Sequence, residues 1–329
     1  MVMLGKTIGP ALAAGNTLIV KPAEQTSLSA LHVANLTREA GFPAGVFNVV
    51  PGYGPIAGAA ISEHMEVDKI TFTGSTAVGK LIQQASGKSN LKSTTLELGG
   101  KSPIVVFDDA DVDEAVRLAN FAVFVCNGQV CCAGSRTFVQ EGIYEEFVKK
   151  SVELAASREV GNPFKTSTIQ GPQVNAQQLN KIMELIDSGI KEGAKLETGG
   201  KRIGNKGYYV EPTVFSNVTD DMRISREEIF GPVQQILKFK TIDEVIKRSN
   251  DTIYGLGSGI VTNNLDNVLT YSQAVKAGTV WVNCYFHVTP QTPLGGYKMS
   301  GFGREFGENA IYEYTEVKTI TIKVVTKNS

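Results

Sequence analysis

Short apolar or β-branched runs, separated by enough chain for a helix, constrain the fold of this sequence more than any other feature. Four such runs occur early in the chain, at Thr17–Val20, Val46–Val50, Lys69–Thr73 and Thr94–Leu98. Parallel strands need a crossover of a dozen or more residues, which is usually a helix. The spacing therefore predicts a βαβ series that forms an open, doubly wound parallel sheet.

A second series of the same kind begins after the glycine pair at 99–100. Pro103–Phe107 has the composition of a buried strand, and a helix is expected over Asp111–Phe124, with Asp111 as its cap and Glu114 in its first turn. Further strands are expected at Thr137–Gln140, Tyr208–Phe215, Gln235–Phe239, Gly259–Thr262 and Thr279–Val282. A chain of 329 residues is longer than one hydrophobic core usually serves, so the two series predict two α/β domains.

The end of the chain has a different pattern. Along Thr319–Val324 the apolar residues Ile320, Ile322 and Val324 alternate with polar ones, which is typical of a strand with one buried face. No turn precedes it that would pair it locally. We therefore expect this strand to add to another sheet or to another subunit.

Charge and hydropathy exclude several classes of protein. The formal net charge is −1, from 32 basic and 33 acidic residues that are interspersed, so nucleic acid is not an expected partner. No apolar run reaches the ~20 residues of a membrane helix. The opening Met1–Gly15 resembles a secretory signal only faintly, because Gly9 and Pro10 interrupt it, and we expect a helix there.

Glu97 is the first candidate catalytic residue. It lies at the end of an apolar strand and two residues before the glycine pair begins, at the carboxyl edge of a parallel sheet where such folds bind their ligands. A partly desolvated carboxylate there has a raised pKa and serves as a general base near neutrality. An exposed glutamate at a strand end is an equally good interpretation of this motif alone.

Cys131 is the second candidate, in a glycine-flanked turn that starts a strand, where its backbone N–H points at whatever the sulfur attacks. The alternative of a buried, inert cysteine fits Cys132 and Cys284 better. Zinc is not expected, because Cys126 and the other cysteines lack Cys-x-x-Cys spacing and the three histidines are remote. A Cys-His hydrolase lacks a histidine in a supporting context. Three cysteines close together also fit a reducing, cytoplasmic compartment better than a disulfide framework.

Two glycine-rich stretches differ in their expected roles. Gly74 to Gly79 follows a strand and opens a helix, so its amides, with Ser75 among them, are placed to meet a phosphate. Gly52-Tyr53-Gly54 has the wrong spacing for a dinucleotide fingerprint, and we expect a tight turn there.

Three stretches together resemble the aldehyde dehydrogenase superfamily: Leu96–Ser102, Asn127–Arg136 and Glu227–Pro232. The resemblance runs from about Leu4 to the chain end, and is strongest to the cytosolic, mitochondrial and retinal enzymes for aliphatic or retinoid aldehydes. It implies the aldehyde dehydrogenase fold: an incomplete NAD-binding domain over 1–99, an α/β catalytic domain over 100–313 and a C-terminal oligomerisation strand in 314–329.

The resemblance also implies a role for each matching position. Cys131 would be the nucleophile that forms a thiohemiacetal and then a thioester, and Glu97 the base that activates water for its hydrolysis. The cofactor implied is NAD, since a carboxylate at Glu24 repels the extra phosphate of NADP. The NAD contacts implied are Lys21, Glu24, Gly74, Ser75, Gly79, Gln178, Glu228 and Phe230, and Asn283 would lie beside the substrate pocket.

The resemblance sets further expectations about partners and activity. It implies a small-molecule aldehyde as substrate, a homo-oligomer (dimer or tetramer), no metal, and a cytoplasmic location, or a mitochondrial one if a targeting peptide preceded Met1. Full-length members carry a domain-sized piece ahead of Met1 that includes a second oxyanion donor, so we expect this chain alone to be a poor enzyme. Lys6-Thr7 stands where close relatives have Trp-Lys, and Tyr285–Gln291 departs from the common pocket sequence.

Two other functions stay open from the sequence. The first is a catalytically silent form that serves a structural or subunit-binding role, which the retention of Cys131 and Glu97 disfavours. The second is a thiol acyltransferase or hydrolase that uses Cys131 without NAD, which Glu24 and the pair Glu228 and Phe230 disfavour.

Overall fold

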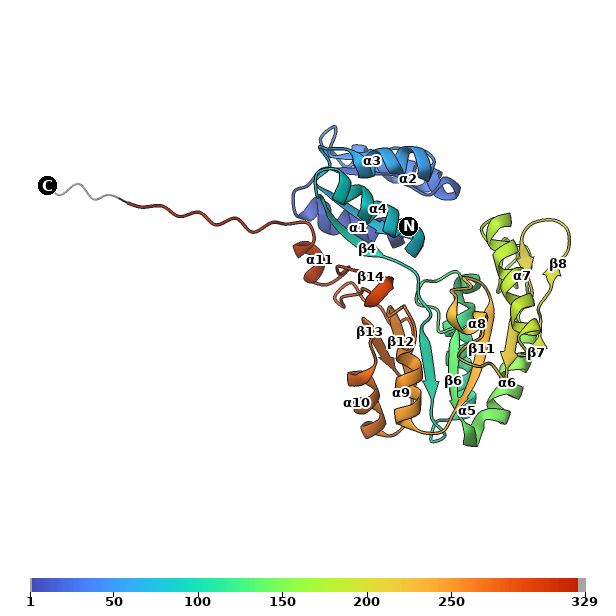
Figure 1. Cartoon of the computed structure of the whole chain (residues 1–329). Helices are drawn as coiled ribbons and strands as arrows, with labels where there is room; N and C mark the ends of the chain where they lie inside the picture. The colour runs from blue at the N-terminus through green and yellow to red at the C-terminus, as the bar shows by residue number, and fades with distance from the viewer. Residues whose placement is uncertain (1, 325–329) are drawn as a thin grey trace. The chain divides into compact units, whose positions relative to one another are not determined.

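A computed structural model describes residues 2–324, and these residues group into two units (Figure 1). The first unit contains the chain up to residue 61 together with 290–293 and the described residues from 304 onward. The second unit contains residues 62–289 and 294–303. Both therefore draw on segments that are far apart in the sequence, and each is described below by itself.

Helices and strands alternate through most of the described chain. The helices are α1 (Val2–Ala13), α2 (Ser27–Glu39), α3 (Ala59–Glu63), α4 (Thr76–Lys88), α5 (Val112–Phe124), α6 (Tyr144–Ala156), α7 (Ala176–Lys191), α8 (Arg223–Arg226), α9 (Ile242–Asn250), α10 (Leu265–Ala274) and α11 (Asn309–Tyr312). The strands are β1 (Leu18–Val20), β2 (Phe47–Val49), β3 (Lys69–Thr73), β4 (Ser93–Glu97), β5 (Pro103–Val106), β6 (Arg136–Gln140), β7 (Lys195–Thr198), β8 (Arg202–Ile203), β9 (Tyr209–Val210), β10 (Thr213–Ser216), β11 (Val233–Phe239), β12 (Gly257–Val261), β13 (Thr279–Val282) and β14 (Gly301–Phe302). No helix among the described residues is both long and apolar enough to cross a membrane.

A seven-stranded sheet forms the centre of the second unit, in the order β13-β12-β5-β6-β11-β10-β7. All neighbouring strands are parallel except β7, which runs antiparallel to β10. Every residue of β5 is buried, as expected for a strand that is covered on both faces. The mixed α/β architecture predicted from the strand spacing is confirmed.

Two apolar clusters cover the two faces of this sheet. One contains Ile182 of α7, Val245 of α9 and Tyr271 of α10, and the other contains Val123 of α5 and Phe147 of α6. Helices α5 and α6 pack on each other and are drawn together in Figure 1. The sheet is therefore the middle layer of three, which fixes the ends of its strands rigidly.

Helix α5 begins and ends as the sequence predicts. The Asp111 side chain accepts a hydrogen bond from the Glu114 N–H at 2.9 Å, which caps the helix. After its C-terminus, Asn127 and Gly128 have φ of 59° and 73°, so the chain leaves the helix through left-handed backbone. This exit leads directly to Cys131.

The strands of the first hundred residues do not form the single sheet that we expected. Strands β3 and β4 pair in parallel and β14 adds antiparallel to β4, whereas β1 and β2 form a separate parallel pair in the first unit. The alternation of apolar residues shows that a segment is a strand, but hydrogen bonding between strands is set by the path of the crossovers. The boundaries 1–99, 100–313 and 314–329 divide the chain by expected role, into NAD-binding, catalytic and oligomerisation parts. This division stays a prediction.

Two local predictions were wrong. The tight turn expected at Gly52-Tyr53-Gly54 is not formed. Gly54 instead opens a wide helical turn, Gly54–Gly58, that continues into α3. Pro55 lies in the first positions of this turn, where proline favours a helix. The segment Tyr208–Phe215 contains two strands, β9 and β10, because Pro212 between them has no N–H to donate. Strand β9 pairs with β8 in a hairpin of its own.

The C-terminal segment carries neither helix nor strand from residue 315 to 324. The side chains of Ile320 and Ile322 are 73% and 77% exposed, and Val317 is fully exposed. The strand expected at Thr319–Val324 is therefore not formed within this chain. Its expected partner was another sheet or subunit, and residues 325–329 lie outside the described part.

A buried ion pair holds the two ends of the first unit together. Helix α1 forms where the sequence predicts it, and the Lys6 ammonium on α1 pairs with the Glu305 carboxylate, both side chains being 5% exposed or less. Burial raises the pKa of Glu305, and the neighbouring Lys6 charge opposes that shift. Nearby, the Asn16 amide donates to the Tyr314 carbonyl at 2.9 Å.

We predict that Lys6→Met destabilises the first unit by ~3–5 kcal/mol, because it leaves the Glu305 carboxylate buried without its partner. The double variant Lys6→Met/Glu305→Leu should regain most of the loss. Hydrogen exchange of α1 amides followed by mass spectrometry measures the effect locally. Lys238→Met, which removes the exposed pair with Glu145, is the control and should change nothing. Equal protection of α1 in wild type and Lys6→Met would contradict the prediction.

Candidate active site

Glu97 is the last residue of β4 and is only 2% exposed, so it is not the exposed strand-end glutamate that the motif alone allowed. Its backbone is held on both sides. The Gly74 N–H donates to the Glu97 carbonyl at 3.0 Å, and the next residue, Leu98, donates to the Ser300 carbonyl at 2.9 Å. The carboxylate therefore projects from a fixed point at the carboxyl end of β4, as the sequence predicts.

The turn that carries Cys131 begins with three consecutive left-handed residues: Cys126, Asn127 and Gly128, with φ of 49°, 59° and 73°. A Cβ at Gly128 would lie 2.0 Å from the Gly231 carbonyl oxygen, so only glycine fits there. Cys131 follows, half-buried, before β6. The turn thus rests directly on the Glu-Ile-Phe-Gly-Pro stretch.

The glycine pair after Glu97 is the point where all three motifs meet. A Cβ at Gly100 would lie 2.2 Å from the Cys131 carbonyl oxygen, and a Cβ at Gly99 would lie 2.7 Å from Glu228 Oε2. The Gly100 N–H donates to Glu228 Oε1 at 2.9 Å. A small hollow, with a cavity volume of only about 10 Å³, lies beside this contact and is lined by Gly100, Gly128, Val130, Ala133, Ser135 and residues 228–231.

The two adjacent cysteines differ in their surroundings. Cys132 is 6% exposed, and the Tyr285 hydroxyl donates to its carbonyl at 2.9 Å. A hydrogen bond with Cys131 and burial raise the pKa of the Cys132 thiol, and the charge of Glu97 raises it further. The Glu97 carboxylate therefore lies within electrostatic range of the Cys132 thiol. Cys132 fits the inert, buried cysteine expected from the sequence, whereas Cys284 is only half-buried.

Gln178 and Phe230 are brought together as the resemblance implies. The Gln178 side chain donates to the carbonyls of Ile229 and Phe230, both at 2.9 Å. Phe230 has φ of 56°, so this backbone is held in a conformation that non-glycine residues seldom adopt. Burial raises the pKa of the neighbouring Glu228 carboxyl group.

Arg136, at the end of the cysteine motif, is a buried residue whose role was not predicted from the sequence. Its Nε donates to the Lys101 carbonyl at 3.0 Å, and its terminal nitrogens donate to the carbonyls of Arg248 and Ser249 at 3.1 and 2.9 Å. Burial lowers the pKa of Arg136 to about 10, so it stays protonated at neutral pH. It ties the cysteine strand to the segment that follows Glu97.

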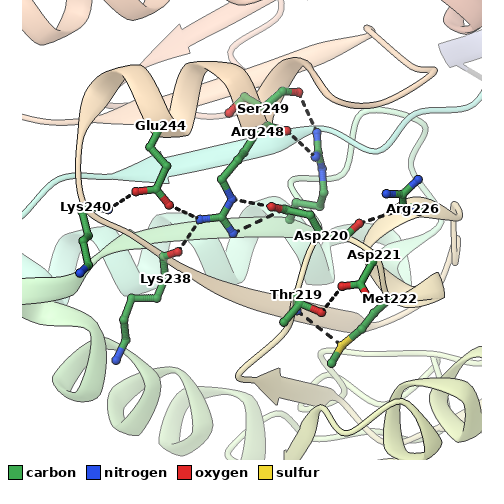
Figure 2. Close-up of polar contacts among 11 residues, drawn as sticks. Thr219, Asp220, Asp221, Met222, Arg226, Lys238, Lys240, Glu244, Arg248 and Ser249 are labelled. Carbon is green, nitrogen blue, oxygen red and sulfur yellow. Dashed lines mark hydrogen bonds and ion pairs between the residues drawn. The ribbon is translucent and has the colours of Figure 1, made fainter.

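The acceptors of Arg136 are themselves fixed, as Figure 2 shows for α9 and the turn around Asp220. Arg248 Nε donates to Asp220 Oδ2 at 2.6 Å, and its Nη1 donates to Glu244 Oε1 at 2.7 Å and to the Lys238 carbonyl at 2.6 Å. The signal that could have found Arg136 is its position, since an arginine that opens a buried strand needs several acceptors.

The Gly74 turn sits at the same edge. The Ser75 hydroxyl accepts from the Val78 N–H at 3.3 Å and caps α4, and a Cβ at Gly79 would collide with Leu98, at 2.6 Å from its Cδ2. Glycine at position 79 thus lets α4 approach the chain that leaves β4. The predicted N-terminal helix position of Ser75 is confirmed.

Lys21 and Glu24 belong to the first unit. Lys21 Nζ donates to the carbonyls of Pro22 and Gly52 at 2.6 and 2.9 Å, and Glu24 Oε1 accepts from the Gly54 N–H at 2.9 Å. The backbone hydrogen bonds of Glu24 lower the pKa of its carboxyl group. The two side chains lie next to each other after β1, as the sequence places them.

Asn283 has a clear structural contact. Its amide accepts from the Thr262 N–H and donates to the Thr262 carbonyl, both at 3.0 Å, and so joins the ends of β12 and β13. A role beside the substrate stays a prediction. Among the described residues no group of three or more His, Cys, Asp and Glu side chains could hold a metal ion.

Comparison with known proteins supplies close relatives. Aldehyde dehydrogenase 1A1 of Macaca fascicularis is 64% identical and that of Homo sapiens 63% identical over 329 residues, which is all of this chain and 66% of each relative. The chain thus spans about two thirds of the length of these curated relatives. Among solved structures, an NAD+ complex of the aldehyde dehydrogenase from Bacillus cereus is 47% identical with a TM-score of 0.96, covering 98% of this chain and 66% of that one. The aldehyde dehydrogenase KauB from Pseudomonas aeruginosa is 44% identical over the same shares, also with a TM-score of 0.96.

The model of the aldehyde dehydrogenase family matches residues 1–320. These matches confirm the predicted fold and the resemblance on which it was based. The chain belongs to the aldehyde dehydrogenase family.

Proposed function

We propose that this chain oxidises an aldehyde to a carboxylic acid with NAD, with Cys131 as nucleophile and Glu97 as general base. The observation that carries the proposal is the contact of the three motifs at Gly99 and Gly100, which packs the turn of Cys131 against the segment that follows the buried Glu97. The relatives support it, since they are named as aldehyde dehydrogenases and one was solved with NAD+.

The proposed first step is attack of the Cys131 thiolate on the aldehyde carbon. A C–S bond forms, the carbonyl π pair moves to oxygen, and the Cys131 N–H stabilises the resulting oxyanion. When bound, NAD would supply the acceptor for the hydride that leaves this carbon, so that Cys131 would carry a thioester. Gln178 holds the Phe230 backbone in place beside this centre.

The proposed second step is hydrolysis of the thioester. Glu97 takes a proton from a water molecule, whose oxygen attacks the thioester carbon and releases the acid and the Cys131 thiolate. Glu97 is buried at the end of β4 and acts in this step as the ionised carboxylate, the form that accepts a proton.

The residues expected to bind NAD fit that cofactor chemically. The first N–H groups of α4, behind Gly74 and Ser75, have no acceptors within their own helix and suit a pyrophosphate. Glu24 is 38% exposed, so its carboxylate is available to a ribose hydroxyl and disfavours a 2′-phosphate. Gln178, Glu228 and Phe230 complete the proposed set.

We further propose a homo-oligomer that forms through the C-terminal segment. Ile320, Ile322 and Val324 alternate along it and are all more than 70% exposed, as expected for a strand that pairs with a second copy. Relatives named as cytosolic aldehyde dehydrogenase support a cytoplasmic location. A catalytically silent subunit, with a role in assembly through the same exposed C-terminal segment, is the second candidate.

The first test concerns the nucleophile. Cys131→Ala should abolish NADH formation from a small aliphatic aldehyde and the acyl adduct seen by intact mass spectrometry, because the thiolate is lost. Cys126→Ala changes an exposed cysteine of the same turn and should keep both signals. Turnover that survives in Cys131→Ala would refute the assignment, and a wild-type chain that forms neither NADH nor adduct would favour the silent subunit.

The second test concerns the base. Glu97→Gln should keep a first burst of NADH and lose at least ~10²-fold in steady-state rate, because hydride transfer precedes the step that needs the base. Stopped-flow absorbance at 340 nm separates the two phases. Glu141→Gln alters an exposed glutamate and should behave as wild type. A variant of Glu97 without a burst but with normal steady turnover would show that Glu97 has a different role.

A further inference from the structure

The backbone immediately before the cysteine motif is strained. Cys126 and Asn127 have φ of 49° and 59°, and the left-handed conformation costs an L-residue roughly 1–2 kcal/mol. Such a conformation persists only where the surroundings hold it, and it gathers at functional sites. Helix α5 already ends at Val125, which has φ of −57° and ψ of 142°, so the left-handed residues that follow are not needed to stop it.

The Asn127 amide supplies contacts that a helix stop does not need. Its Oδ1 accepts from the Gly171 N–H at 3.0 Å, and its Nδ2 donates to the Pro172 carbonyl at 3.2 Å. The Gln173 side chain returns the contact by donating to the Asn127 carbonyl at 3.5 Å. Three successive residues of one loop thus bond to a single half-buried asparagine.

Gln129 extends the same contact by one residue. Its Oε1 accepts from the Val174 N–H at 3.1 Å, so residues 171–174 bond without a gap to Asn127 and Gln129. We call these contacts the amide clamp. They join the turn before Cys131 to a loop about 45 positions further along the chain.

The loop held by the amide clamp leads directly into α7. Asn175 caps this helix by accepting from the Gln178 N–H at 2.8 Å. Gln178 in turn holds the carbonyls of Ile229 and Phe230. A shift of the loop would therefore move the Phe230 backbone relative to the turn that carries Cys131.

We propose that Asn127 and Gln129 are positioning residues that fix the Cys131 thiol relative to the Gln178 and Phe230 backbone. The proposal rests on the nucleophile role of Cys131. Hydride transfer needs its reacting atoms in one geometry, and small misplacements are costly in rate. A side-chain clamp keeps the strained turn in that geometry while the sulfur forms and breaks its bonds.

Asn127→Gly is the decisive variant, because it relieves the backbone strain and removes only the amide. Asn250→Ala is the matched control. Its Oδ1 accepts from the Lys276 N–H at 2.7 Å and its Nδ2 donates to the Ala274 carbonyl at 2.9 Å, the same pattern away from the cysteine turn. Gln129→Leu removes the second half of the amide clamp and serves if Asn127→Gly fails to fold.

Two readouts distinguish positioning from general stability. In Asn127→Gly, kcat for an aliphatic aldehyde should fall ~10-fold or more while KM changes less than about twofold. Alkylation of Cys131 by iodoacetamide, followed by peptide mass spectrometry, should accelerate at least about threefold, because local opening exposes the half-buried thiol. Asn250→Ala should match wild type in both measurements.

The outcomes separate this inference from the proposed function. If Asn127→Gly matches Asn250→Ala in kcat and in alkylation rate, the amide clamp has no positioning role. If the wild-type chain oxidises no aldehyde, the proposed function fails, and the alkylation rate alone decides whether the clamp holds the thiol. Faster alkylation in both Asn127→Gly and Gln129→Leu then supports it, and unchanged rates overturn it.

Discussion

Close backbone contact at Gly100 is the constraint on which the rest of the candidate site depends. A Cβ at this position would lie 2.2 Å from the Cys131 carbonyl oxygen, so any residue other than glycine would force the two motifs apart. The same contact leaves the Gly100 N–H free to bond Glu228. Strand β4 thus delivers Glu97 to within reach of the cysteine turn, and rigid strands on each side keep it there.

Buried cations that donate hydrogen bonds to neutral acceptors are the second feature of this arrangement. Lys101 lies fully inside the second unit, where burial lowers its pKa well below the ordinary value, and its Nζ donates to Gln235 Oε1 at 2.8 Å. Arg136 donates to three backbone carbonyls instead of a carboxylate. Burying such groups costs free energy unless every donor is satisfied. The ion pair between Arg248 and Asp220 helps here, because it fixes the end of α9 that supplies carbonyl acceptors to Arg136.

The sequence predicted the elements of this fold better than their partners. Runs such as Pro103–Phe107 become strands because their residues suit two buried faces, and the cap at Asp111 marks the start of α5. Pairing was not readable, since β14 adds to β4 from 200 positions away through two residues, Gly301 and Phe302. Glu97 and Cys131 were proposed from motif chemistry, and the other site residues from the family resemblance. The roles of Asn127, Gln129 and Arg136 were not predicted, because their hydrogen-bond partners lie in distant segments that no local pattern specifies.

These distant hydrogen-bond partners separate two kinds of residue within the site: those that react and those that position them. The reactive groups, Cys131 and Glu97, stand on strand ends and turns that are specified locally by glycine and apolar runs. Their relative position is set by polar side chains that bond to backbone groups elsewhere, as Arg136 does on one side of the cysteine motif and Asn127 on the other. Backbone acceptors carry no ionisable group, so these restraints keep their strength across the pH range in which a thiolate and a carboxylate change charge. A site whose chemistry moves protons is thereby held through backbone groups, which do not titrate.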